Sequence, residues 1–280
     1  MKLKEYPLSL FRKWQLRLNS ASVPFNKSNS IPCVISLTSI PSRIETIDLV
    51  IRSLLMQDQP AEKIILWLNS SLKGLLPKKL NDLQSDYFEI RFRDQTSPHR
   101  KLVFSLQELT EKVVVTCDDD IMYDKTWLGR LYKDHLRYPK DIIAHQCRAI
   151  TVIDEALLSY HQWPTIEDKD VSCANFLPIG YGGVLYPVGS LHSDVTDASK
   201  YMMLAPKADD LWFKAMSLIN NTQVRRSSDP RGKPLPIIGT KGSSLAKTNI
   251  SQDGNRIQWQ AICDYYQINP DCSEQKKYED

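Results

Sequence analysis

The segment that decides the fold is Lys-Val-Val-Val-Thr-Cys-Asp-Asp-Asp, residues 112–120. Its first part is a short run of valines, which favours a strand buried on both faces of a sheet. Three adjacent carboxylates follow at once, and their mutual repulsion is costly unless a cation lies among them. Oxygen ligands of this kind suit Mg²⁺ or Mn²⁺. The segment therefore predicts a divalent-cation site at the end of a buried strand, with an exposed acidic turn, or a cap for the helix after Asp124, as the alternative.

Around this strand, short apolar runs alternate with segments in which apolar residues recur at helical spacing. The expected strands are residues 33–38, 63–68, 89–93 and 112–117, and the expected helices are residues 44–55, begun by a capping box at 42–45, and 98–109. This alternation predicts a parallel α/β sheet with right-handed crossovers. Ligands bind such sheets outside the carboxyl ends of the strands. The expected binding loops begin near Ser39, Asn69, Asp94 and Asp118.

The second half of the chain has a less regular pattern. Residues 150–178 are rich in aromatic side chains and show no clear period. The expected elements are a helix over 127–135 with Asp124 as its N-cap, strands over 142–145 and 181–187, and helices over 209–219 and 257–266. Glycines precede the strand at 181–187, so we expect the chain to enter that strand through a tight turn.

The composition is that of a folded protein of ordinary charge. The 280 residues carry 36 basic and 33 acidic side chains, a net charge of +3, which is too balanced to indicate nucleic-acid binding. No apolar run approaches the ~18 residues of a membrane helix, and no signal peptide is recognisable, so we expect a cytoplasmic location. The six cysteines form no Cys-x-x-Cys pair and are expected to be reduced, with a Cys263–Cys272 disulfide as the alternative.

The first 18 residues differ from the rest because basic and apolar side chains interleave at helical spacing. A basic amphipathic helix can lie on an anionic membrane surface, and the alternative is a helix that packs on the body of the protein. Residues 19–30 are rich in Ser and Asn and are expected to form a linker.

A second acidic pair, Asp209-Asp210, opens the helix expected at 209–219. Acidic residues at a helix N-terminus are favoured by the helix dipole, which is a sufficient structural reason for the pair. Paired carboxylates can also have different pKa values, which would leave one of them as a general base. Both interpretations remain open from the residues alone.

Other polar residues could contribute to a ligand site. Arg43, Arg100, Lys101 and Arg148 lie near expected strand ends and could bind phosphate, although each taken singly is more often a solvated surface residue. The loop Gly180-Tyr181-Gly182-Gly183 would let the backbone approach a ligand closely, or simply form a tight turn. The chain has no Walker, dinucleotide, serine-hydrolase or zincin motif.

Several of these segments, in their order along the chain, resemble those of the GT-A glycosyltransferases. Their amino-acid sequences resemble in particular a bacterial family-2-like group. The matching segments are residues 35–44, 63–68, 101–102, 115–120, 182–187 and 205–213, and the resemblance covers roughly residues 31–265. It implies a single-domain GT-A fold, with a mixed, mostly parallel sheet flanked by helices. The implied division is an N-terminal segment and linker at 1–30, a donor-binding half at 31–122, an acceptor-binding and catalytic half at 123–268, and a polar tail at 269–280.

The resemblance also implies site residues. Asp118 and Asp120 match the Asp-x-Asp that holds Mn²⁺ or Mg²⁺ on the diphosphate of a nucleotide-sugar, and Asp119 takes the middle position. The other implied donor-site residues are Thr38, Arg43, Asp94, Lys101, Gly182 and Gly183. His192 matches a further metal ligand. Asp209-Asp210 aligns with the acidic pair whose second member is the catalytic base. The family pair is often Glu-Asp, whereas both members here are aspartates, and we assign the base to Asp210.

The function implied is an inverting hexosyl or N-acetylhexosaminyl transferase that uses a UDP-sugar and a divalent ion. The acceptor would be a glycan or lipid-linked glycan, as in lipopolysaccharide or capsule synthesis, with residues 1–18 contacting the cytoplasmic face of the inner membrane. Two alternatives are a sugar-nucleotide pyrophosphorylase, which normally needs a glycine-rich loop after the first strand, and a non-catalytic binding module on a degenerate transferase fold.

Overall fold

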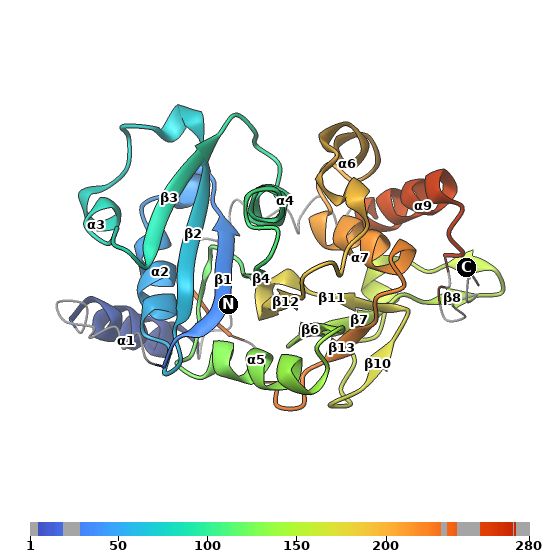
Figure 1. The fold of residues 1–280 in the computed structure, drawn as a ribbon, viewed down its shortest axis with the longest axis horizontal. Helices are drawn as coiled ribbons and strands as arrows, with labels where there is room; N and C mark the ends of the chain where they lie inside the picture. Colours follow the sequence, from blue (N-terminus) through green and yellow to red (C-terminus); the bar gives the residue numbers. More distant parts are fainter. Residues whose placement is uncertain (1–4, 19–28, 231–233, 240–252, 271, 273–280) are drawn as a thin grey trace.

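The computed structural model describes residues 5–18, 29–230, 234–239, 253–270 and 272. An eight-stranded mixed sheet runs through the molecule in the order β10-β13-β6-β12-β4-β1-β2-β3 (Figure 1). Its strands are β1 (Ile31–Thr38), β2 (Ala61–Asn69), β3 (Phe88–Arg93), β4 (Val113–Thr116), β6 (Ile142–Ala144), β10 (Ser172–Cys173), β12 (Val184–Tyr186) and β13 (Val224–Arg226). The first four form a parallel block, as the sequence predicts, with β1 between β2 and β4.

Helices cover both faces of this sheet. They are α1 (Glu5–Leu18), α2 (Ile47–Leu55), α3 (Lys78–Asn81), α4 (Arg100–Glu108), α5 (Trp127–Arg137), α6 (Ala198–Leu204), α7 (Asp209–Ile219) and α9 (Gly254–Tyr266). Three two-stranded ribbons complete the fold: β5 (Ile121–Met122) with β14 (Leu235–Pro236), β7 (Cys147–Ala149) with β11 (Phe176–Pro178), and β8 (Val152–Ile153) with β9 (Ala156–Leu157).

Alternation along the strands explains why the sheet is buried on both sides. Val115 packs in a cluster with side chains of α2 and α5, whereas its neighbour Val114 packs with side chains of α4 and α7. Successive side chains of a strand point to opposite faces, so a continuous apolar run such as 113–115 serves two cores at once.

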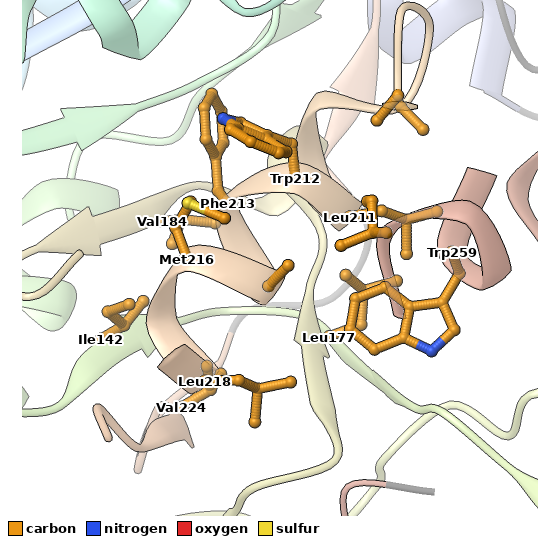
Figure 2. Close-up of a cluster of buried hydrophobic side chains, with 14 of the residues drawn as sticks. Ile142, Leu177, Val184, Leu211, Trp212, Phe213, Met216, Leu218, Val224 and Trp259 are labelled. Carbon is orange, nitrogen blue, oxygen red and sulfur yellow. The ribbon is translucent and has the colours of Figure 1, made fainter. Parts of the chain in front are cut away.

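The second of these cores surrounds α7. Figure 2 shows Met216 of this helix beside Val184 of β12 and Leu211 facing Trp259 of α9, and Trp212 belongs to the same buried cluster. The helix is therefore fixed along its length by burial of apolar surface, which is the main stabilising term in folding. Its first turn, with Asp209 and Asp210, is positioned by this packing.

A single sheet joins the two halves of the chain. β12 lies between β4 and β6 and runs antiparallel to both, with Val184 opposite Thr116 on one side and Ala144 on the other. This arrangement confirms the predicted single-domain, mixed and mostly parallel sheet. The predicted functional boundaries at 30, 122 and 268 stay predictions.

One predicted helix start and one predicted N-cap are wrong. No capping box forms at 42–45: Pro41–Arg43 is a 3₁₀ turn and α2 begins at Ile47, because the chain turns there to bring Arg43 onto the acidic segment. Asp124 is not the N-cap of α5. Its carboxylate accepts a hydrogen bond from the backbone N–H of Thr126 at 3.0 Å, and Thr126 is the N-cap residue.

Three further predictions concern the cysteines, membrane helices and the ends of the chain. All six cysteines lie in the described residues, and no disulfide joins Cys263 to Cys272 or any other pair there. None of the helices in the described residues is long and apolar enough to cross a membrane. Most of the linker predicted at 19–30 and most of the tail predicted at 269–280 lie outside those residues.

Candidate active site

The cavity that carries the candidate site lies at the carboxyl ends of β1 and β4. It has a volume of about 530 Å³, within the range of small-molecule sites. Its walls come from the loops after the two strands, the first turn of α4, and the segment that leads into α7. The lining residues are Thr38, Ser39, Ile40, Arg43, Thr96, Ser97, Pro98, Arg100, Lys101, Cys117, Asp118, Asp119, Asp120, Met202, Pro206, Lys207, Asp209 and Asp210.

The three aspartates after β4 have different environments. Asp119 is buried and accepts a hydrogen bond from Ser39 Oγ at 2.6 Å and another from Arg43. Arg43 also lies 3.3 Å from Asp120. The middle carboxylate is thus neutralised inside the protein, and the two outer carboxylates are the more exposed ones.

The outer carboxylates resist ionisation more than a free aspartate does. Burial raises the pKa of Asp118 to about 7, with contributions from the charges of Asp120, Asp210 and Asp209, while Lys101 opposes the shift. Burial also raises the pKa of Asp120, and Arg43 opposes that shift. Two partly exposed carboxylates with raised pKa values are ready to bind a cation or a proton.

On the opposite wall, Asp209 and Asp210 open α7 as the sequence predicts. One oxygen of Asp210 accepts a hydrogen bond from the backbone N–H of Gly180 at 2.9 Å, and the other lies 3.2 Å from Lys101 Nζ. Asp209 is more buried and lies 2.7 Å from the same ammonium group. Burial and the neighbouring Asp209 raise the pKa of Asp210. The two members of the pair are therefore chemically distinct.

Lys101 connects the two acidic groups. Its Nζ lies 3.5 Å from Asp118, in addition to its contacts with Asp209 and Asp210, and its side chain is only 7% exposed. Burial alone would lower the pKa of Lys101, but the three carboxylates raise it well above its ordinary value. A fixed positive charge thus sits between the wall after β4 and the wall at α7.

Gly180 makes this network possible, and it was not among the predicted site residues. A Cβ atom at this position would lie 2.5 Å from Lys101 Nζ and 2.9 Å from Asp210 Oδ1. The predicted glycines serve packing instead. Gly183 has φ +100° and lies against Trp127, Gly182 lies against Gln146, and neither lines the cavity. The glycine-rich motif was the correct signal, but sequence alone did not identify the member that faces the carboxylates.

Of three further predicted residues, one lines the cavity and two do not. Thr38 lines the cavity, but its hydroxyl donates to the backbone carbonyl of Trp67 at 2.8 Å. Asp94 is exposed and outside the cavity lining. His192 is also outside that lining, and its Nδ1 accepts a hydrogen bond from the backbone N–H of Asp194 at 3.3 Å.

The candidate phosphate-binding arginines separate into two kinds. Arg100 is buried at the cavity wall, where its Nη2 donates to the carbonyl of Ser39 at 3.0 Å. Its Nη1 has no hydrogen-bond partner within the described residues, and burial lowers its pKa to about 10. Arg148 instead donates to the carbonyls of Tyr160 and Trp163 at 3.0 and 2.9 Å, so it holds the aromatic segment in place.

The carboxylates at the cavity suit a divalent ion whose remaining ligands come from a bound substrate. Across the residues that the structure describes, no group of three or more His, Cys, Asp or Glu side chains is arranged to hold a metal ion. Asp118 and Asp120 supply two carboxylates at the cavity. Mg²⁺ and similar ions are commonly bound by one or two carboxylates together with substrate phosphates.

A parallel block that ends in Asp-x-Asp, followed by an antiparallel central strand and a helix that starts with an acidic pair, is the arrangement of the GT-A fold. Residues 40–170, just under half of the chain, match the family described as glycosyl transferase family 2. The match covers β2, β3, β4 and the Asp118–Asp120 segment, and it supports the predicted resemblance to family-2-like glycosyltransferases over those residues.

Solved structures with a related arrangement include Staphylococcus aureus TarS 1–349, with a TM-score of 0.47 and 15% identity over 73% of this chain and 59% of that one. Another is glucosyl-3-phosphoglycerate synthase from Mycobacterium tuberculosis, with a TM-score of 0.32 and 14% identity over 40% of this chain and 42% of that one. A third is 4-diphosphocytidyl-2C-methyl-D-erythritol synthase from Anaerococcus prevotii, with a TM-score of 0.46 and 11% identity over 82% and 95%. The chain thus spans 59% or less of the first two proteins, and we draw no argument from these likenesses. No curated protein matches the sequence.

Proposed function

We propose that this protein transfers a sugar from a nucleotide-diphospho-sugar, most simply a UDP-sugar, to a glycan acceptor with inversion at the anomeric carbon. The observation that carries the proposal is one cavity in which the Asp118–Asp120 segment faces the Asp209–Asp210 pair across Lys101. One acidic group is suited to a metal-bound diphosphate and the other to proton transfer.

The donor diphosphate would be bound at the wall after β4. Asp118 and Asp120 would hold Mn²⁺ or Mg²⁺, which when bound would stabilise negative charge on the departing nucleoside diphosphate. Arg100 supports this placement because its free Nη1 is a buried donor at the cavity wall. A donor of this kind is well suited to a phosphate oxygen.

Asp210 is the better candidate for the general base. It is the more exposed member of the pair, and Gly180 fixes the direction of its carboxylate. Its raised pKa makes it a stronger base than an ordinary aspartate. Asp209 is held by Lys101 at 2.7 Å and would orient that lysine rather than move a proton. Attack by the acceptor hydroxyl from the Asp210 side, opposite the leaving diphosphate, would invert the configuration.

The acceptor would lie against the aromatic segment of residues 148–178. Tyr160 is close enough to Asp210 for the carboxylate, together with burial, to raise the pKa of the tyrosine to about 12. Arg148 stacks over the Tyr160 ring at 4.9 Å and holds it in place. Aromatic faces of this kind bind sugar rings well. A lipid-linked surface glycan, of the lipopolysaccharide or capsule type, is the acceptor class we propose.

The test is to incubate the protein with UDP-, GDP- and CMP-sugars, with and without Mn²⁺, and to identify the released product. We expect a nucleoside diphosphate to be released with one donor, only with the metal present, and not by Asp120→Asn. Asp58→Asn, an exposed aspartate outside the cavity lining, is the control and should behave as the wild type.

Two other results would replace the proposal. Formation of a sugar nucleotide from a nucleoside triphosphate would indicate a pyrophosphorylase. The structure does not favour that activity, since the segment after β1 is the glycine-free turn Pro41–Arg43. Metal-dependent nucleotide binding with no turnover on any donor and acceptor would indicate a binding module.

A further inference from the structure

The N-terminal helix α1 has an apolar face that is largely exposed among the residues that the structure describes. Six of its side chains are between 45% and 61% exposed: Tyr6, Leu8, Leu10, Phe11, Trp14 and Leu18. From this surface we propose that α1 docks the protein on an anionic lipid bilayer. The inference concerns binding alone and does not depend on the proposed transferase activity.

The helix is attached to the protein by its other side, which is largely polar. Ser9 and Leu16 are buried, and Ser9 Oγ donates to the carbonyl of Pro236 at 2.9 Å. Arg12 donates to the carbonyl of Tyr123 at 3.4 Å. A surface helix normally buries its apolar stripe and exposes its polar one. Here the orientation is reversed, so the exposed apolar face is not accounted for by packing of the fold.

The chemistry of α1 fits an anionic bilayer. Besides Arg12 on the attached side, the helix has the basic residues Lys13 and Arg17, and Glu5 is its one acidic residue. Arg17 lies 3.9 Å from Asp48, and its side chain is 43% exposed. A helix of this length spans about 21 Å, enough to lie flat in the headgroup region with aromatic side chains at the interface. Basic side chains beside such a face are attracted to anionic headgroups. This combination favours a lipid surface over an apolar protein groove.

The helix also has a short connection to the candidate active site. β14, which accepts the hydrogen bond from Ser9, pairs with β5. In the next residue, Ile237 N–H donates to the carbonyl of Asp120 at 2.8 Å. A bilayer bound by α1 would therefore hold the cavity at a fixed position relative to the lipid surface. If the proposed function is correct, this placement suits an acceptor carried on a lipid.

Trp14 provides a direct test because it is the one exposed tryptophan. The other five, at 67, 127, 163, 212 and 259, are at most 2% exposed. The protein is mixed with vesicles of pure phosphatidylcholine or with about 30% phosphatidylglycerol, and tryptophan emission is recorded. We expect a blue shift, and quenching by brominated acyl chains, with the anionic vesicles, and we expect both to weaken as salt increases.

Co-sedimentation of variants identifies the surface responsible. We expect Phe11→Gln/Trp14→Gln to lower the affinity for anionic vesicles by about tenfold or more. The matched control, Leu136→Gln/Ile257→Gln, removes two equally exposed apolar residues from α5 and α9 and should bind as the wild type. Because the affected side chains are exposed, both proteins should unfold at the wild-type temperature.

Three results would overturn the inference. They are no binding of the wild type to anionic vesicles, an equal loss in the control variant, or a dimer in solution that Phe11→Gln/Trp14→Gln abolishes. None of these readouts measures sugar transfer, so failure of the docking surface and failure of the proposed function are distinguishable.

Discussion

The two walls of the cavity are built in different ways. The wall after β4 belongs to the parallel block, in which each strand pairs along its length and the binding loops follow the strand ends. The wall at α7 depends on contacts between distant segments, such as Gly180 with Asp210 and β12 with β4. The difference teaches that a regular framework can be predicted from local sequence, whereas the opposing wall is set by tertiary packing.

The first and largest expected effect is on turnover, and it distinguishes the wall at α7 from the donor-binding wall after β4. Asp210→Asn should lower kcat by roughly 10² to 10⁴-fold, because the general base is lost, while metal-dependent donor binding at the other wall is retained. Steady-state kinetics with saturating donor, together with nucleotide titration, measures both quantities. Near-normal turnover would remove Asp210 from the role of base.

The second effect distinguishes Asp119 from Asp120 by the loss of stability that each substitution causes. Asp119→Asn should lower the free energy of unfolding by about 3 kcal/mol, since it leaves Arg43, whose side chain is only 12% exposed, without its closest carboxylate. Asp120→Asn changes a more exposed carboxylate and should cost less than about 1 kcal/mol. Urea unfolding measures both, and equal costs would contradict the division between a structural and a ligand-binding aspartate.

The third effect tests how closely the walls approach each other. Gly180→Ala should lower kcat about 10- to 100-fold, because its Cβ would displace Lys101 and Asp210. Gly129→Ala is the matched control, since its Cβ would meet only the flexible end of Gln59. Full activity in Gly180→Ala would show that the network tolerates displacement.

The fourth effect concerns a contact between the walls. His99, just before α4, stacks on Tyr201 of α6 with ring centroids 4.3 Å apart. Burial and the charge of Lys101 lower the pKa of His99 to about 3, with Asp210 opposing. Between about pH 6.5 and 3 the unfolded chain binds this proton and the folded chain does not, so stability falls as pH falls through that range.

His99→Phe keeps the stacked ring and removes the titrating group. Relative to the wild type, its free energy of unfolding should gain about 2 kcal/mol between pH 7 and pH 4.5. Urea unfolding at the two pH values measures the difference. Parallel pH profiles for the two proteins would mean that His99 is protonated in the folded state.

Sequence predicted the framework well for a physical reason. Apolar periodicity reports burial, so β1, β4 and α7 were found within one or two residues of their ends. Predictions at helix starts were weaker: the start of α2 at Ile47 depends on the long-range pairing of Arg43, which no local pattern contains.

The candidate site was predicted in part for the same reason. The acidic residues and Lys101 stand out by type, and the structure brings them to one cavity. Choosing Gly180 over its neighbours, or placing His192 away from the cavity lining, requires knowing how β12 pairs and where α7 begins. Those are properties of the tertiary fold.

The most direct measurement of the central claim is thermal unfolding with UDP, GDP or CMP, with and without Mn²⁺, for the wild type and for Asp118→Asn and Asp120→Asn. Ligand at 100 times its dissociation constant adds about 2.7 kcal/mol, which is readily measured. The account predicts a Mn²⁺-dependent increase in unfolding temperature with one nucleotide, lost in both variants while their unliganded folds stay intact. Retention of the full metal-dependent increase by both variants would contradict it.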